Sequence, residues 1–298
     1  MMERTSQNHR YSVMVLAHNE ERHIEACLDS IFSADPDLDI EVFVMANGCT
    51  DCTESVVKEY ANKNPSVHLV SIELGDKCNA WNVFVHEVVP VRCPTRAMYF
   101  FVDGDARFLP GSFSSMANLL ASNSEAHAVS APPASGRSKA RDREELLAER
   151  GLVANLYGLS SNFVHRLIVE EVRIPLGLEG DDGLIGALIR WDLDPRRAMN
   201  VNLIVPCPDA GFVFESMNPT RLADWRDYWK RMVRYGRRRY EFTLLGGRLK
   251  SEGIKSMPVH ISELYKYADK LTLTWDGVYT LTNFVALIKM RRTGKRHI

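Results

Sequence analysis

Short apolar runs alternate with helical patterns through the first half of the chain, and this rhythm constrains the fold more than any other feature. Five runs rich in β-branched and aromatic residues predict strands at 11–16, 40–45, 67–72, 97–102 and 126–131. Each run is almost continuously apolar, as expected of a strand covered on both faces. Between the first two runs, Ile24, Cys27, Leu28 and Ile31 share one face of a predicted helix. The pattern predicts an α/β fold, with a Rossmann-like, mostly parallel sheet flanked by helices.

The composition is typical of a globular chain and excludes several classes of protein. The 298 residues suffice for one large domain or for a domain with a substantial appendage. Lys and Arg number 37 and Asp and Glu 38, so a net charge of −1 gives no general attraction to nucleic acid. No apolar run approaches the roughly 20 residues of a membrane span, and the polar first ten residues do not form a secretory signal. We therefore expect a cytoplasmic protein with no nucleic-acid partner.

Two later regions depart from the strand and helix rhythm. Residues 132–145 are rich in turn formers and then in charges, and they predict a mobile surface loop, a candidate lid. From about residue 219 the pattern becomes helical, with an apolar stripe opposite a basic one. The apolar stripe contains Leu222, Trp225 and Trp229, and the basic stripe contains Arg226, Lys230 and Arg234. This change predicts two domains, at 1–215 and 216–298.

Polar residues follow the predicted strands at the positions where open α/β sheets bind ligands. The first strand leads into Ala17, His18, Asn19 and Glu20, the second into Asn47, and the fourth into Asp103, Gly104 and Asp105. The sequence contains neither the G-x-G-x-x-G fingerprint nor the P-loop pattern. Two carboxylates at one strand end are costly to bury unpaired, which favours a hard divalent cation such as Mg²⁺ or Mn²⁺. A turn capped by aspartate is the alternative.

Five segments, taken in order, resemble motifs of the family 2 glycosyltransferases, which have the GT-A fold. VMVLAHNEE resembles that family's opening strand and turn, VFVMANGCTDCT its nucleobase loop and GDKCNAWN its G-K-x-x-A-x-N segment. FVDGDARFLPGSF resembles its D-x-D strand, and GLEGDDGLIGALI its late acidic motif. The likeness implies a GT-A nucleotide-sugar-binding and catalytic domain at 1–215. A helical, basic C-terminal region at 216–298 would then contact the acceptor or a membrane surface.

The resemblance also implies roles for individual residues. The nucleotide-sugar donor would contact Ala17, His18, Asn19, Glu20, Asn47, Lys77, Asp103, Asp105 and Arg234. Asp105 and Asp103 would ligate a divalent metal, Mn²⁺ or Mg²⁺, and Asp182 would be the catalytic base, with Asp181 as the alternative. Asn47 stands where the family often has an aspartate that binds the nucleobase, so the donor base stays open, with UDP as the first expectation.

The implied reaction is the transfer of one sugar from a nucleotide-sugar donor to a hydroxyl of a saccharide or lipid-linked acceptor, as in cell-surface polysaccharide or glycolipid synthesis. Inversion is expected, because the sequence nominates no second, nucleophilic carboxylate for a retaining mechanism. Two alternatives stay open: a sugar-nucleotide nucleotidyltransferase, and a catalytically silent scaffold that binds sugar nucleotides.

The last apolar stretch, at 277–290, leads into the cations Arg291, Arg292, Lys295 and Arg296. It is too short to span a bilayer. Two interpretations remain: the stretch packs on the catalytic domain, or it attaches the protein peripherally to the anionic inner face of a membrane.

Overall fold

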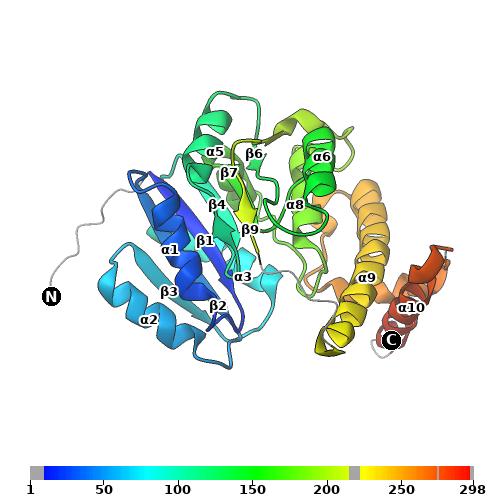
Figure 1. Ribbon diagram of the computed structural model, residues 1–298. Helices are drawn as coiled ribbons and strands as arrows, with labels where there is room; N and C mark the ends of the chain where they lie inside the picture. Colours follow the sequence, from blue (N-terminus) through cyan, green and yellow to red (C-terminus); the bar gives the residue numbers. More distant parts are fainter. Residues whose placement is uncertain (1–9, 215–221, 274, 296–298) are drawn as a thin grey trace. The chain divides into compact units, whose positions relative to one another are not determined.

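The computed structural model describes residues 10–214, 222–273 and 275–295, and its contacts divide the chain into two compact units (Figure 1). The first unit runs to Asp76 and includes Ala80–Glu171 and the chain from Val201. The second contains Lys77–Asn79, Val172–Asn200 and the described residues beyond 221. Residues 172–200 thus group with the C-terminal region and not with the predicted domain 1–215, because they bond to its long helix, as shown below.

A seven-stranded sheet with the order β3-β2-β1-β4-β7-β6-β8 lies at the centre of the first unit. Its strands are β1 (Tyr11–Ala17), β2 (Ile40–Asn47), β3 (Val67–Ile72), β4 (Met98–Asp103), β6 (Ala128–Ser130), β7 (Leu156–Ser160) and β8 (Ile204–Pro206). β1 runs parallel to β2 and β4, and β2 runs parallel to β3. β7 runs antiparallel to β4 and β6, while β6 and β8 are parallel. The mostly parallel sheet is confirmed, and β7 and β8 are strands that the sequence analysis did not predict.

Short helices connect and cover these strands. They are α1 (Ile24–Ala34), α2 (Thr53–Lys63), α3 (Lys77–Val83), a π-helical turn η1 (Phe84–Val88), α4 (Val89–Arg92), α5 (Ser112–Ala121), α6 (Lys139–Glu149), α7 (Ser161–Val169) and a 3-10 turn η2 (Val201–Leu203). A small ribbon pairs β5 (Arg107–Phe108) with β9 (Phe212–Val213). The predicted apolar stripe of α1 is buried, as expected.

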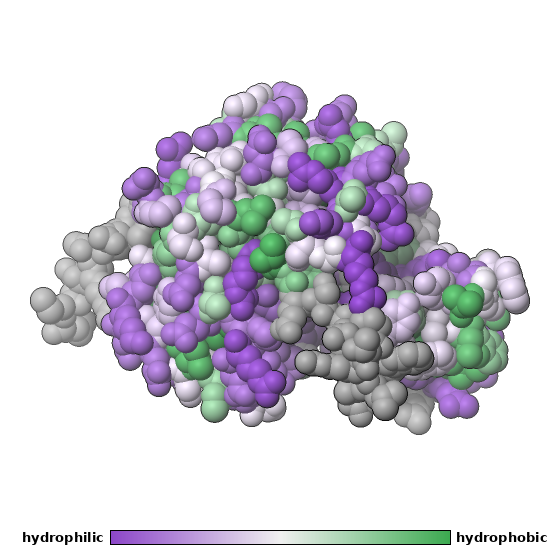
Figure 2. Space-filling view, in the orientation of Figure 1, coloured by the Kyte–Doolittle hydropathy of each residue, from purple (hydrophilic) through white to green (hydrophobic). Residues whose placement is uncertain are grey.

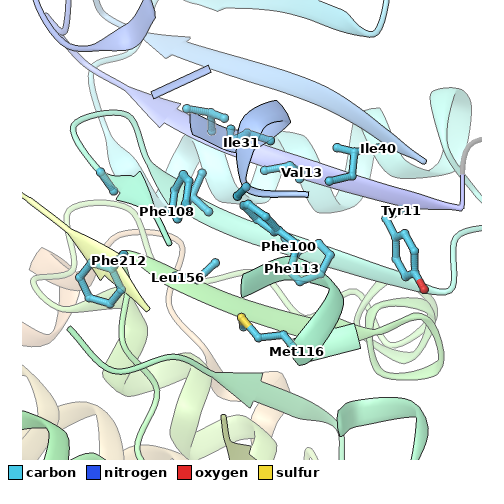
Figure 3. Packing of buried hydrophobic residues seen from close by; sticks show 14 of the residues in the cluster. Tyr11, Val13, Ile31, Ile40, Phe100, Phe108, Phe113, Met116, Leu156 and Phe212 are labelled. Carbon is cyan, nitrogen blue, oxygen red and sulfur yellow. The ribbon is translucent and has the colours of Figure 1, made fainter. Parts of the chain in front are cut away.

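Both faces of the sheet are covered by packed side chains. On one face, Phe100 of β4 meets Phe113 of α5 edge to face, with ring centroids 5.0 Å apart (Figure 3). On the other face, the next residue, Phe101, stacks on Tyr157 of β7 at 4.8 Å. The indole nitrogen of Trp81 donates to the Tyr157 hydroxyl at 3.0 Å. This double burial explains why the strands are continuously apolar in sequence.

The predicted loop at 132–145 is wrong for its second half, which begins α6. Only Leu146 of this helix is buried, so the helix has almost no apolar face. Local polar contacts support it instead: the Ser138 hydroxyl donates to Asp142 at 2.6 Å, and Arg141 pairs with Glu145 one turn later. The dense charges therefore stabilise a surface helix and not an irregular loop.

The second unit is helical, as predicted for the C-terminal region. Its elements are α8 (Asp181–Arg190), α9 (Leu222–Glu252), α10 (Thr280–Gly294) and three 3-10 segments, η3 (Ile254–Ser256), η4 (Ile261–Lys270) and η5 (Gly277–Tyr279). α10 packs against α9 and η4. Of the predicted apolar stripe, Trp229 is 45% exposed, and the side chains of Leu222 and Trp225 lie outside the described residues. Among the helices described, none is both long and apolar enough to cross a membrane.

Candidate functional site

The carboxyl ends of three neighbouring strands bring the polar segments together in the first unit. Ala17 at the end of β1 pairs in register with Ala46 of β2, and Leu16 pairs with Asp103 of β4. The amide of Gly104 also donates to the carbonyl of Leu16 at 2.8 Å. The residues that follow these strands therefore meet at one edge of the sheet, which is where an open α/β sheet binds its ligand.

Side chains of the first two loops are bonded to each other. The Nδ1 of His18 lies 2.6 Å from the carbonyl of Asn47, and a carbonyl only accepts, so Nδ1 is the donor. The side-chain amide of Asn47 donates to the carbonyl of Ala17 at 2.9 Å, and the Asn19 side chain accepts from the amide of Thr50 at 2.8 Å. Asn47 is only 5% exposed. Its predicted contact with a nucleobase stays a prediction, and its amide group already bonds to the protein.

Glycine is required where the second of these loops approaches its neighbour. Gly48 has a φ of +58°, and a Cβ added there would lie 2.5 Å from the Cα of Gly75. The amide of Gly48 donates to the carbonyl of Ile72 at 2.7 Å. The backbones following β2 and β3 are therefore in direct contact, and no larger residue fits between them.

Carboxylates concentrate at this edge of the sheet. The pKa of Glu20 is raised from 4.5 to about 7 by burial and then by the charges of Asp105, Asp103 and Asp51. Burial also acts to raise the pKa of Asp51, but hydrogen bonds from Thr53 and from the amide of Glu21 lower it overall. The edge therefore carries an excess of negative charge that a cation would neutralise.

The donor atoms at this edge suit a hard divalent cation that is completed by a ligand. Within the described residues, no three His, Cys, Asp or Glu side chains converge on one metal position. Asp103 and Asp105 stand on either side of a glycine at the end of β4, and the Arg107 guanidinium donates to the Asp105 carbonyl at 3.0 Å. One or two carboxylates plus water and phosphate oxygens form a common Mg²⁺ or Mn²⁺ environment. The residues present therefore fit such an ion.

The predicted acidic pair begins α8 in the second unit, so its expected place at the start of a helix is confirmed. Gly180, with a φ of +83°, precedes the helix, and Asp181 and Asp182 occupy its first turn, where negative charge is favourable. The Nζ of Lys77 lies 3.7 Å from a carboxylate oxygen of the buried Asp181. An Nη of Arg238 lies 3.2 Å from the more exposed carboxylate of Asp182.

Helix α9 holds the loop that precedes this pair. The fully buried Glu241 accepts from the amide of Glu179 at 2.9 Å and from the hydroxyl of Tyr265. Arg237 pairs with Glu179 and lies 3.4 Å from Glu241. Arg238 packs directly over Gly180, where an added Cβ would lie 2.3 Å from its Nε. The sequence analysis did not predict these contacts, although the i, i+4 spacing of Arg237 and Glu241 was visible.

The family follows from a comparison with known sequences. The profile described as Glycosyl transferase family 2 matches residues 12–165, which is more than half of the chain. The chain belongs to glycosyl transferase family 2. No curated protein sequence matches this glycosyltransferase.

Solved structures share the fold of this glycosyltransferase. The mannosyltransferase PcManGT from Pyrobaculum calidifontis, in complex with GDP-Man and Mn²⁺, is 17% identical with a TM-score of 0.61, and 96% of this chain and 87% of that chain are covered. TarS 1-349 from S. aureus, in complex with UDP-GlcNAc, is 11% identical with a TM-score of 0.50, over 90% of this chain and 94% of that chain. At these identities the likeness shows the fold alone, which is the GT-A fold.

Two predicted donor contacts of the glycosyltransferase lie in the second unit. Lys77 begins α3 and pairs with Asp181, as described above. Arg234 is exposed on α9. Among the described residues, no carboxylate forms an ion pair with it. The roles of both residues in donor binding remain predictions.

Proposed function

We propose that this glycosyltransferase transfers one sugar from a nucleoside diphosphate sugar to an acceptor hydroxyl, with inversion at the anomeric carbon. The observation that carries this proposal is the meeting of Glu20, Asp103 and Asp105 at the carboxyl ends of β1 and β4. A divalent cation between these carboxylates and a diphosphate would reduce the repulsion between the two sets of negative charges. PcManGT binds GDP-Man and Mn²⁺, and TarS binds UDP-GlcNAc, which supports a donor of this class.

We place the donor across Ala17–Glu20, Asn47 and the Asp103–Asp105 turn. Asp105 and Asp103 are the residues that would hold Mn²⁺ or Mg²⁺, which when bound acts as a Lewis acid toward the leaving diphosphate. Arg107 orients the turn through the carbonyl of Asp105. UDP-sugars are the first donors to test, and the acceptor we propose is a saccharide or lipid-linked hydroxyl, as in cell-surface polysaccharide or glycolipid synthesis.

We assign the general base to Asp182. Its role is to accept the proton of the acceptor hydroxyl, which typically contributes about 10²- to 10⁴-fold to the rate. Asp181 is the weaker candidate, because it is buried beside Lys77. Asp182 is more accessible, and one of its carboxylate oxygens lies 3.2 Å from an Nη of Arg238. In this proposal the acceptor hydroxyl binds a carboxylate oxygen of Asp182 beside Arg238.

Thermal unfolding of the full chain tests the donor site. UDP, GDP, dTDP and CMP are added singly, each with Mn²⁺ and with EDTA. We expect one nucleotide to stabilise the protein only with Mn²⁺, by about 2.7 kcal/mol at a ligand concentration 100-fold above Kd. Asp105→Ala should abolish this stabilisation, and Asp37→Ala, which changes an exposed aspartate of the same unit, should leave it intact. Stabilisation that is equal with EDTA would contradict a metal-linked donor site.

Turnover tests the general base separately. Asp182→Asn should keep the metal-dependent stabilisation by nucleotide and lose sugar transfer, measured as nucleotide release with a saccharide acceptor. Equal loss of donor affinity in Asp182→Asn and Asp105→Ala would show that the roles are wrongly assigned. Unchanged turnover in Asp182→Asn would move the base to another residue.

A further inference from the structure

Large hydrophobic side chains gather at the solvent-facing side of α10 and of the turn before it. Trp275 is 87% exposed, Val278 85% and Leu281 58%, and Phe284 is also exposed. Figure 2 shows this apolar surface over the C-terminal helices. Single exposed hydrophobic residues are ordinary, but neighbouring ones on one short segment mark a contact surface.

The opposite side of α10 already has its partners within the second unit. Asn283, Ala286, Leu287, Met290 and Gly294 are buried. Asn283 lies against Gly236 of α9, and Gly294 lies against the Tyr265 carbonyl of η4, where an added Cβ would lie 2.4 Å from the oxygen. This packing lies within the second unit, whereas the sequence analysis considered packing on the catalytic domain, and it accounts for one face of the helix only. The outer face remains exposed.

The outer face changes from apolar to cationic along the helix. Positions 281, 284, 285, 288, 289, 292 and 295 fall on one side at helical spacing, and they are Leu, Phe, Val, Ile, Lys, Arg and Lys. Lys289, Arg292 and Lys295 are exposed. The sequence contains no acidic residue after Asp276, and Asp276 itself pairs with Arg239 at 2.8 Å. The helix itself therefore offers apolar contact and positive charge with no carboxylate of its own, and η4 contributes Asp269, which lies 3.4 Å from Arg291.

We propose that this outer face of α10 binds the surface of a membrane that contains anionic lipids. Exposed Trp and Phe side chains enter the boundary between headgroups and acyl chains, and Lys and Arg side chains bind the headgroups. A second copy of the chain fits less well, because a symmetric contact would bring together two copies of a helix that carries cations and no carboxylate of its own. This inference goes beyond the proposed function, since it concerns a surface that the donor site does not use.

Vesicle sedimentation of the full chain tests the proposal. We expect binding to phosphatidylcholine vesicles that contain about 30% phosphatidylglycerol, and little binding to phosphatidylcholine alone. Leu281→Asp should abolish binding. Arg292→Gln should weaken it about fivefold, the usual effect of one cation near an anionic surface. Both side chains are exposed, so both variants should unfold at the temperature of the wild type.

A control variant and a measurement of the oligomeric state show whether a membrane or a second copy of the chain binds this face. Val169→Asp alters an exposed valine at the end of α7 and should leave vesicle binding unchanged. Equal loss of binding in Val169→Asp and Leu281→Asp would overturn the proposal, as would equal binding to neutral and anionic vesicles. Light scattering that shows a dimer abolished by Leu281→Asp, with no vesicle binding, would assign the face to a second copy instead. Nucleotide-induced stabilisation should persist in Leu281→Asp, which separates this test from that of the donor site.

Discussion

The buried carboxylate of Glu241 should make the stability of the protein depend on pH. This side chain has no exposed surface, and its neighbours in the second unit are Tyr265, Arg237 and Glu179. Burial raises its pKa from 4.5 to about 7, although the hydrogen bonds from Tyr265 and the Glu179 amide and the charge of Arg237 act to lower it. Near neutral pH, the folded protein therefore holds Glu241 either as a protonated carboxyl or as a buried charge, and burial disfavours the charged form.

The sign and size of the effect follow from the two pKa values. Because the pKa is higher in the folded state than the 4.5 expected of the unfolded chain, the protonated group favours folding below pH 4.5. This contribution is lost as the pH rises through about 7. The difference between the two pKa values corresponds to about 3 kcal/mol in the free energy of unfolding, and most of that change lies between about pH 5 and about pH 8.

Urea unfolding of the wild type and of Glu241→Gln measures this contribution. The glutamine cannot ionise, so the stability of the wild type relative to the variant should fall by about 2 kcal/mol or more from about pH 5 to about pH 8. The pH dependence that comes from the raised pKa of Glu20 is the same in both proteins, so it cancels in the difference between their stabilities. Glu252→Gln, an exposed change on the same helix, should follow the wild type at every pH. Parallel curves for the wild type and Glu241→Gln would refute the reasoning.

Three further substitutions test the packing, each by urea unfolding near neutral pH. Arg96→Met should lower the free energy of unfolding by about 3–5 kcal/mol, because it removes the buried guanidinium that lies 2.6 Å from Glu41. A loss of less than about 1 kcal/mol, as is typical of a surface ion pair, would contradict a buried ion pair here. Gly294→Ala should cost about 1–3 kcal/mol by forcing α10 away from η4, and an unchanged midpoint would contradict that contact. Gly48→Ala should cost a similar amount and weaken nucleotide binding, since its Cβ would overlap Gly75; unaltered binding would separate this loop from the donor site.

The parallel half of the sheet was predictable because each strand there carries its own signal. A run such as 97–102 is apolar throughout, and only a strand covered on both faces needs that pattern. β7 gave no such signal, because Leu156–Ser160 contains a glycine and a serine among five residues. At Gly158, an added Cβ would lie 3.0 Å from Met98, so the glycine is explained by packing that no local pattern reveals.

The edge with Asp103 and Asp105 was predictable for a related reason, since strand ends and polar residues are both local features. The partners of the acidic pair were not. Arg238 continues the spacing of the predicted basic stripe, yet it binds Asp182, which lies more than fifty positions earlier in the chain. Helical spacing shows which residues share a face, but only the fold shows what that face meets.

The two sets of acidic residues are attached to the protein in different ways. Asp103 ends β4, which pairs with β1 on one side and with β7 on the other. Displacing it means breaking the ladder of a central strand, and such strands open only when their whole unit unfolds. The segment at Glu179 is held to α9 by side chains, since Glu241 accepts from the Glu179 amide and Arg237 pairs with the Glu179 carboxylate. Its amide should therefore exchange with deuterium through brief local openings, while the amides of β4 stay protected. The protein thus combines acidic residues held by a strand ladder with acidic residues held by side-chain contacts.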